Sequence, residues 1–255
     1  MDTGRSYWDM YDEYRNRNNL DELIDSTLNK TSSEFNFSSV KSCLAIGPGE
    51  GSVELKFIKK CTPNISKLTA VEPDHESVEH LKVLLRESLP GVESMVIESY
   101  VGKWKDPNNA VDLVAMFHSL YEVLHGGRDG RRTLLKRAHD SWLADGGYLA
   151  VIMSSPRRVK SPRCAYEVFE RLGTPLEPVE EVEEDILDVG FIKQHVYEMH
   201  HVQDFSNPND DYLAFFQRHM LQPVTLDDVR RVLKQLYPDD KGENYTTLAI
   251  YKKAL

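Results

Sequence analysis

The stretch Ser42-Cys-Leu-Ala-Ile-Gly-Pro-Gly-Glu-Gly-Ser52 decides the fold of this 255-residue chain. Its apolar first half predicts a strand that is buried on both faces, which is typical of a parallel sheet. The turn that follows contains Gly47, Gly49 and Gly51, and a helical apolar pattern comes next. Because glycine backbone can approach a ligand closely, a strand, a glycine turn and a helix together predict a cofactor site in an α/β domain.

A second apolar run, Leu68-Thr-Ala-Val-Glu-Pro-Asp74, ends on a carboxylate. Glu72 stands at the carboxyl end of this strand, where open α/β sheets place their ligands, and its side chain can accept the two hydroxyls of a ribose. The same residues also suit a helix start with Asp74 as the N-cap, and Glu72 precedes that cap, so the two interpretations are compatible. The two stretches together predict an adenosyl cofactor. The GxGxG spacing disfavours a nicotinamide dehydrogenase.

The composition is that of an acidic globular protein, with a formal net charge of −10 and 40% hydrophobic residues. This balance disfavours a nucleic-acid partner, and the basic cluster from Arg157 to Arg163 is too short to change that. No apolar run approaches the roughly 18–20 residues of a membrane span, and the N-terminus lacks a signal-peptide core. We therefore expect a cytoplasmic protein without a membrane partner, acting as a monomer on a small molecule.

The residues that most often bind metals do not stand at metal-binding spacings. Cys43, Cys61 and Cys164 form no CxxC pair, so we expect reduced thiols and a core position for Cys43. The doublet His200-His201 follows the sixth expected strand. Adjacent side chains of an extended chain point to opposite sides, which disfavours a metal site there. No metal is expected.

The remaining patterns predict an α/β chain with a Rossmann-like sheet. Besides the two strands above, strands are expected over residues 94–98, 110–117, 148–153, 191–199 and 244–252. Helices are expected over 74–88, 131–144, 179–189, 211–220 and 225–236. We expect three segments: an N-terminal helical segment over residues 1–40, a cofactor-binding core over 41–155, and a completion of the sheet with substrate-binding insertions over 156–255.

The N-terminal segment carries aromatic residues at helical spacing: Tyr7, Tyr11 and Tyr14. One interpretation is a helix that packs on the core. The other is a lid over the pocket, in which the rings of Tyr11 and Tyr14 provide apolar walls and faces for a cationic substrate.

Polar residues also follow the fourth strand, at the sheet edge where ligands are expected. His118 and Glu122 are four apart, so a helix starting there places them on one face, near Tyr121. A neutral histidine, with an unperturbed pKa of ~6.5, can accept a proton from a nucleophile, and a glutamate can anchor an ammonium group. The alternatives are a structural histidine and a solvated helix charge.

Beyond these local patterns, the chain resembles the histamine N-methyltransferase family over most of its length. The resemblance lies in Leu44-Ala-Ile-Gly-Pro-Gly-Glu-Gly51, Val71-Glu-Pro73, Met116-Phe-His-Ser-Leu-Tyr-Glu-Val123 and Glu184-Asp-Ile-Leu-Asp-Val-Gly-Phe191. The aromatic N-terminal segment and Asn244-Tyr-Thr-Thr-Leu248 fit as well. The resemblance implies a class I methyltransferase with a seven-stranded, mostly parallel sheet, helices on its flanks and a small substrate-binding subdomain. It implies S-adenosylmethionine as the cofactor and methylation of a nitrogen on a small amine or imidazole compound.

The resemblance also implies roles for individual residues. Cofactor contacts are expected from Gly47, Glu72, Ser77 and Phe117, with Ser77 standing where the family has a glutamine. Substrate contacts are expected at positions where this chain departs from the family: His118 replaces a glutamine, Glu122 a tyrosine and Thr246 an asparagine. Glu22 is the expected counterpart of the family's N-terminal glutamate.

Two alternatives to a histamine-like acceptor remain open from the sequence. The acceptor can be another small metabolite, such as a histidine dipeptide, an amino acid or a hydroxyl compound. The chain can also be a non-catalytic subunit that binds the cofactor on the same scaffold, although an intact aromatic N-terminal segment argues for a closed pocket.

Overall fold

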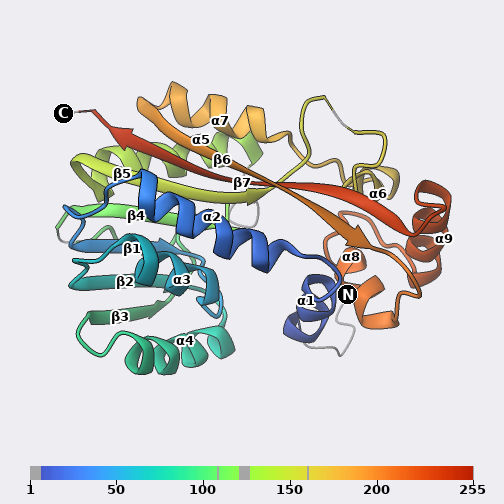
Figure 1. The fold of residues 1–255 in the computed structure, drawn as a ribbon, viewed down its shortest axis with the longest axis horizontal. Coiled ribbons are helices and arrows are strands. Elements are labelled where there is room, and N and C mark those ends of the chain that lie inside the picture. The colour runs from blue at the N-terminus through green and yellow to red at the C-terminus, as the bar shows by residue number, and fades with distance from the viewer. Residues whose placement is uncertain (1–6, 108, 121–126, 160, 255) are drawn as a thin grey trace. The chain divides into compact units, whose positions relative to one another are not determined.

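The computed structural model describes residues 7–107, 109–120, 127–159 and 161–254 (Figure 1). Its helices are α1 (Tyr7–Arg15), α2 (Leu20–Glu34), α3 (Ser52–Cys61), α4 (His75–Ser88), α5 (Gly127–Arg137), α6 (Glu167–Arg171), α7 (Val179–Asp188), α8 (Asp210–Arg218) and α9 (Leu226–Leu236), with a π-helical turn at Ala138–Trp142. Its strands are β1 (Ser42–Ile46), β2 (Lys67–Glu72), β3 (Glu93–Glu98), β4 (Val111–Phe117), β5 (Leu143–Ser154), β6 (Phe191–Asp204) and β7 (Lys241–Lys253).

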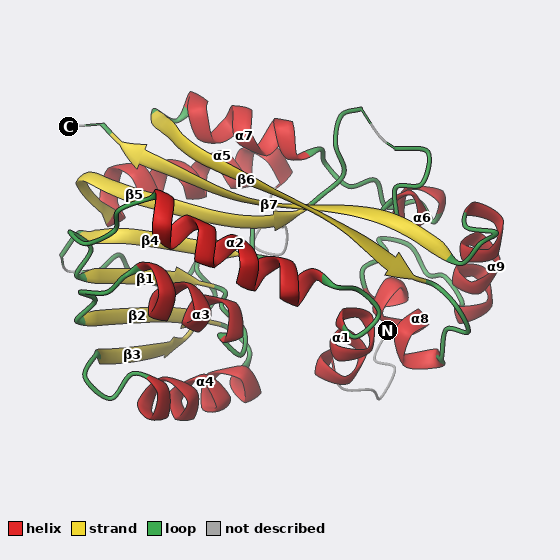
Figure 2. Cartoon of the chain, in the orientation of Figure 1, coloured by secondary structure: helices red, strands yellow, loops and turns green. Residues whose placement is uncertain are grey.

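The described strands form one seven-stranded sheet in the order β3-β2-β1-β4-β5-β7-β6. Strands β1 to β5 pair in parallel, and β7 runs opposite to its two neighbours (Figure 2). Figure 2 also shows α3 in front of the sheet and α5 behind it. Helices on both faces explain why β1 and β4 are almost entirely buried, since strands covered on two sides need apolar residues throughout. The arrangement confirms the expected Rossmann-like α/β fold.

The chain divides into two compact units. Unit 1 comprises Met1–Ile24, Ser154–Val182 and Glu198–Thr246, and unit 2 comprises Asp25–Met153, Glu183–Tyr197 and Thr247–Leu255. Strands β6 and β7 therefore contribute residues to both units. Residues 1–40, expected to form one segment, are divided after Ile24.

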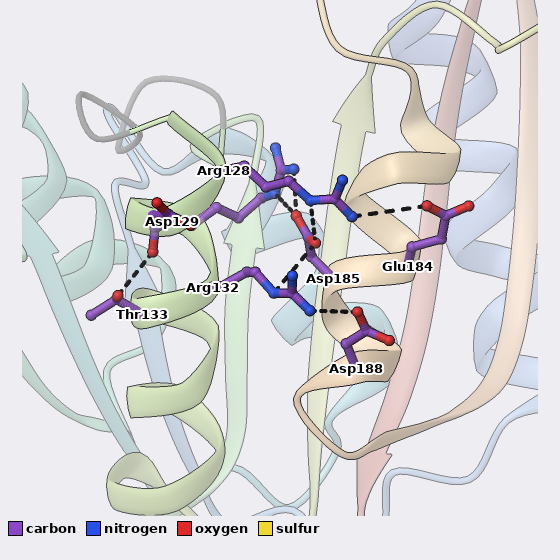
Figure 3. A network of polar contacts seen from close by, with 8 residues as sticks. Arg128, Asp129, Arg132, Thr133, Glu184, Asp185 and Asp188 are labelled. Atoms are coloured by element: carbon purple, nitrogen blue, oxygen red, sulfur yellow. Dashed lines mark hydrogen bonds and ion pairs between the residues drawn. The ribbon is translucent and has the colours of Figure 1, made fainter.

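Unit 2 contains a buried ion-pair network between α5 and α7 (Figure 3). Arg131 and Asp185 are both fully buried, and the Arg131 Nε donates to Asp185 Oδ2 at 2.8 Å. Arg128 donates to the other oxygen of the same carboxylate, also at 2.8 Å, while Arg132 pairs with Asp188 at the surface. Burial alone would raise the pKa of Asp185, but the hydrogen bonds from Arg131 and Arg128 outweigh it and lower the pKa. The pair holds α7 against α5, and removal of either partner would leave the other charge buried and uncompensated.

Unit 1 has an aromatic core to which α1 contributes. The ring of Tyr14 stacks on Phe215 with centroids 4.3 Å apart, and both belong to a cluster that includes residues of α6, α8 and α9. This contact fits the packing interpretation of the N-terminal tyrosines. Helix α9 begins with a capping box, in which the side chains of Thr225 and Asp228 each accept from the other residue's backbone N–H.

Several expected element boundaries differ from those observed. The helix expected over 131–144 begins earlier, at Gly127, and passes into a π-helical turn that ends at Trp142. Strand β5 begins at Leu143 rather than at residue 148, so Gly146 and Gly147 lie inside it, beside a register shift in its pairing with β4. Strands β6 and β7 are longer than the alternation of their residues indicates. No helix among the described residues is both long and apolar enough to cross a membrane.

The expectations for cysteine and histidine hold where the structure describes them. Cys43, Cys61 and Cys164 are buried and free of disulfides. Burial raises the pKa of the Cys43 thiol, as suits an unreactive core residue. In β6, His200 is exposed and His201 is buried, so the two side chains of the doublet lie on opposite sides of the strand.

Candidate cofactor site

The candidate site lies at the carboxyl ends of β1, β2 and β4 in unit 2. The chain passes from β1 outward to β2 and β3 and then returns to place β4 on the other side of β1. The strand order therefore reverses between β1 and β4, and a crevice at such a point is where open α/β sheets bind ligands. Gly47 follows β1, Glu72 ends β2 and His118 follows β4, so three predicted site residues meet at one sheet edge.

The glycines of the turn after β1 are required by its backbone and its neighbours. Gly47, Gly49 and Gly51 have φ angles of 61°, 57° and 79°, in the left-handed region that residues with a Cβ adopt at a cost. A Cβ on Gly47 would lie 2.8 Å from the Cβ of Ser119, and one on Gly51 would lie 2.3 Å from Leu81. The turn is thus packed closely between the loop after β4 and α4.

Glu72 is held in a fixed orientation by the backbone around it. Its side chain is almost fully buried, with 6% of the residue exposed. One carboxylate oxygen accepts from the backbone N–H of Gly49 at 2.9 Å, and the other accepts from that of Asp74 at 3.0 Å. A carboxylate can accept about four hydrogen bonds, so one oriented by two backbone donors still has the capacity to accept from a vicinal diol. The glycine turn and the acid, predicted separately, therefore form one hydrogen-bonded structure.

A second buried carboxyl group, which the sequence analysis does not single out, stands in the first turn of α3. Glu54 is 6% exposed. Burial raises the pKa of its carboxyl group to about 8, and the negative charge of Glu72 adds to the rise. A signal was present, because Glu54 interrupts the apolar residues Val53, Leu55 and Phe57 directly after the glycine turn.

The other two predicted cofactor contacts are engaged within the chain. Asp74 is the N-cap of α4, as predicted, and its carboxylate accepts from both the backbone N–H and the hydroxyl of Ser77, at 2.8 and 2.7 Å. Phe117 is buried at the end of β4, where its ring meets that of Phe57 edge-on at a centroid distance of 5.2 Å. Contacts from Ser77 and Phe117 to a cofactor stay predictions.

His118 lies directly after β4 in a strained conformation. Its φ of 53° is uncommon for a residue other than glycine, and its backbone N–H donates to the carbonyl of Ile152 at 2.7 Å. Strain of this kind collects at functional sites, where the surrounding structure has to maintain it. Tyr121 and Glu122, predicted to act beside His118, lie outside the described residues, so the helical spacing expected of them stays a prediction.

The remaining predicted substrate residues belong to unit 1. Tyr11 and Tyr14 lie on α1, where the hydroxyl of Tyr11 accepts from Arg15 at 2.8 Å. Glu22 is exposed in the first turn of α2. Thr246 is buried in β7, where its hydroxyl lies 2.7 Å from that of Ser154 and 3.2 Å from Nε2 of His201. Their roles toward a substrate stay predictions.

A shallow cleft of about 230 Å³ lies elsewhere in unit 2. It is lined by the end of α2, the segment before β1 and the end of α3. None of the predicted site residues borders it. Most of its lining residues precede β1, whereas open α/β sheets bind their ligands at the carboxyl ends of the strands.

No family model matches the sequence, and no curated protein matches it. Solved structures do match. A protein from Bacillus halodurans C-125, provisionally named a methyltransferase, matches at a TM-score of 0.65 and 12% identity, over 91% of this chain and 99% of that one. Geranyl diphosphate C-methyltransferase from Streptomyces coelicolor A3(2), solved with geranyl diphosphate, Mg²⁺ and S-adenosyl-L-homocysteine, matches at 0.55 and 14% identity, over 92% and 80%.

A third solved structure with the same fold has a different activity in its name. The [4+2]-cyclase SpnF matches at a TM-score of 0.53 and 16% identity, over 91% of this chain and 81% of that one. At such low identities the matches bear on the fold and not on the chemistry. The protein therefore has the fold of class I methyltransferases.

Proposed function

We propose that this protein is an enzyme that transfers a methyl group from S-adenosylmethionine to a small molecule. The observation that carries the proposal is the hydrogen bond between Glu72 and the glycine turn, at the point where the strand order reverses. The carboxylate is buried, its orientation is fixed by backbone donors, and it stands beside left-handed glycines. This is the donor and acceptor set that an adenosyl group with an amino-acid tail requires.

The residues present fit the cofactor. Glu72 would accept the ribose hydroxyls, and the turn through Gly47, Gly49 and Gly51 would approach the amino-acid tail. The negative charge of Glu72 suits a ligand that carries positive charges. S-adenosylmethionine, when bound, supplies a methyl group already activated by its sulfonium.

The chain's own part in the reaction is then positioning and proton handling. Transfer from a sulfonium needs the acceptor in line with the methyl group and water kept away, and a fixed site supplies most of that advantage. His118, next to the glycine turn, is the residue we propose to hold the acceptor or to take its proton. The strained backbone of His118 supports this role, because an unstrained residue would serve a purely structural position.

For the acceptor, we propose a small molecule with a nucleophilic nitrogen or oxygen, in the range from histamine-like amines and imidazoles to other small metabolites. The resemblance of the sequence to histamine N-methyltransferases supports the nitrogen compounds. A role other than methyl transfer, catalytic or not, is the second candidate, because the same fold occurs in a [4+2]-cyclase and so does not by itself require methyl transfer.

The test is methyl transfer from labelled S-adenosylmethionine to a panel of amines, imidazoles, amino acids and phenols. The proposal expects turnover on at least one class, and a change in rate or in preferred acceptor for His118→Gln. Binding of S-adenosylhomocysteine without turnover on any member of the panel would favour the second candidate. Unaltered rates and preferences in His118→Gln would remove that residue from the mechanism.

A further inference from the structure

A buried polar cluster in unit 1 lies on one side of β6 and β7. Alternate residues of a strand share a face, so His201 and Gln203 of β6 point to one side, and so do Asn244 and Thr246 of β7. All four are at most 1% exposed. The hydroxyl of Thr246 joins the strands, because it contacts Nε2 of His201 at 3.2 Å.

One end of this cluster is fully hydrogen-bonded. The amide nitrogen of Gln203 donates to the carbonyls of Tyr14 and Arg17 and to the hydroxyl of Tyr212, at 3.2, 3.4 and 3.0 Å. Its amide oxygen accepts from Asn18 at 3.0 Å. Gln203 thereby anchors the end of α1, and this is a structural role.

The other end of the cluster contains two polar atoms without a hydrogen-bond partner among the described residues. Nδ1 of His201 and Oδ1 of Asn244 are buried and have no hydrogen-bond partner within the described part of the chain. His201 is two positions from Gln203 on β6, and Asn244 is two positions from Thr246 on β7. Residues with and without a full set of hydrogen bonds therefore lie side by side on each strand. A buried polar atom left without a partner costs free energy, and native structures rarely keep one without a ligand, an ion or a water.

The hydrogen bonds around the two atoms define which groups a ligand must offer. If the Ser154 hydroxyl donates to Thr246 and the Thr246 hydroxyl donates to Nε2 of His201, then Nδ1 of His201 carries the hydrogen and is a donor. The side-chain nitrogen of Asn244 donates to the hydroxyl of Tyr14 at 3.3 Å, which leaves Oδ1 as an acceptor. A hydroxyl group both accepts and donates, so it offers the kinds of group that the two atoms lack.

The charges around the cluster disfavour a cation. Burial, together with the positive charge of Arg15, lowers the pKa of His201 to about 4, so the imidazole is neutral at pH 7. The carboxylates of unit 1 nearest to the cluster in sequence are engaged elsewhere: Asp204 accepts from the backbone N–H of Ser206, Glu198 pairs with Arg157, and Glu243 accepts from Ser161. A ligand with a fixed positive charge would therefore find its nearest carboxylates already engaged.

We propose that His201 and Asn244 form a binding site for a neutral, hydroxyl-bearing small molecule, whose hydroxyl accepts from His201 and donates to Asn244. The site lies in unit 1 and goes beyond the proposed function, since its binding test does not require methyl transfer. It favours alcohols and phenols over ammonium compounds.

The first experiment uses stability and needs no ligand. In urea unfolding, Gln203→Leu removes a fully bonded side chain and is expected to lower the midpoint. Asn244→Leu removes an unsatisfied oxygen along with one long hydrogen bond to Tyr14, and is expected to lower the midpoint by less than half as much as Gln203→Leu does. An equal drop in both variants would mean that Asn244 is satisfied in the free protein, and would overturn the proposal.

The second experiment measures binding of phenol, catechol and benzyl alcohol, with histamine as the cationic comparison, by calorimetry on the full chain saturated with S-adenosylhomocysteine. At least one neutral compound is expected to bind, and Asn244→Leu to weaken it at least tenfold while S-adenosylhomocysteine affinity stays the same. Tighter binding of histamine than of all three, or no binding of any, overturns the proposal. If S-adenosylhomocysteine itself fails to bind, the proposed function fails, and the same titrations without it still test the site.

Discussion

The two units treat their buried polar groups differently. In unit 2, Glu72 is oriented by two backbone N–H donors and Asp185 by two arginines. In unit 1, His201 and Asn244 are as deeply buried, but each keeps a polar atom without a partner among the described residues. The difference teaches how to separate two uses of polarity in a core. A buried polar group with all its hydrogen bonds stabilises the structure around a site, whereas one that lacks a hydrogen bond indicates a place where a ligand binds.

The largest expected effect tests the satisfied side of this comparison. Arg131→Met leaves the buried Asp185 without its main partner and should cost about 3–5 kcal/mol of stability, measured by urea unfolding. The double variant Arg131→Met/Asp185→Leu should recover at least half of that loss. The matched control is Lys82→Ala, whose exposed ion pair with Glu79 should contribute no more than about 1 kcal/mol. Equal losses of stability in Arg131→Met and the control would mean that burial adds nothing to the cost of removing the arginine partner of Asp185.

The next effect concerns the glycine turn. Gly47→Ala places a Cβ 2.8 Å from that of Ser119 in a backbone with φ of 61°, so we expect a loss of roughly 1–3 kcal/mol and weaker cofactor binding. Gly91→Ala is the control in the same unit, because nothing lies within 4 Å of the added carbon. Thermal unfolding of the two variants checks this, and a control as unstable as Gly47→Ala would refute the packing argument.

Opposite pH dependences should distinguish the two units. Burial raises the pKa of Glu54 to about 8, so between about pH 4.5 and 8 the native state holds a proton that the unfolded state lacks, and stability falls as pH rises. His201, with its pKa lowered to about 4, gives the reverse: between about pH 4 and 6.5 the unfolded state binds the extra proton, and stability rises with pH. Each group changes the slope by at most about 1.4 kcal/mol per pH unit.

Variants assign these slopes to their residues. Glu54→Gln should flatten the fall above pH 6.5, where His201 no longer contributes, and His201→Leu should flatten the rise near pH 5. The measurement is the urea midpoint of each variant and of the wild type across pH 4 to 9. Slopes that both variants leave intact would show that these groups titrate normally in the folded protein.

The smallest effect lies at a helix end in unit 1. Thr225→Ala removes one half of the capping box of α9 and should cost about 1 kcal/mol, seen as a lower urea midpoint. Thr225→Ser keeps the hydroxyl and serves as the control. A midpoint that falls equally in both variants would point to the methyl group of Thr225 rather than to its cap.

Much of unit 2 could be predicted from the sequence because its signals are local. Glu72 and the Asp74 cap accept from backbone N–H groups two and three residues along the chain, and only the bond from Gly49 to Glu72 spans 23 residues. The opposite orientations of His200 and His201 also follow from alternation along a single strand.

The features that could not be predicted depend on contacts distant in sequence. Arg131 and Asp185 are 54 residues apart, and both occur in segments whose other charges lie at the surface. Asn244 and His201 are buried together only because β6 and β7 are neighbours, a pairing that no local pattern specifies. The start of β5 was missed because Leu143 continues the apolar face of the helix before it.

The most direct test of the account is a calorimetric titration of S-adenosylhomocysteine into the wild type and Glu72→Gln, with Glu93→Gln as an exposed control. The account predicts one binding site in the wild type and the control. It predicts at least roughly thirtyfold weaker affinity in Glu72→Gln, because a charge-assisted pair of hydrogen bonds to the ribose is lost. No binding to the wild type, or equal affinity in all three proteins, would contradict it.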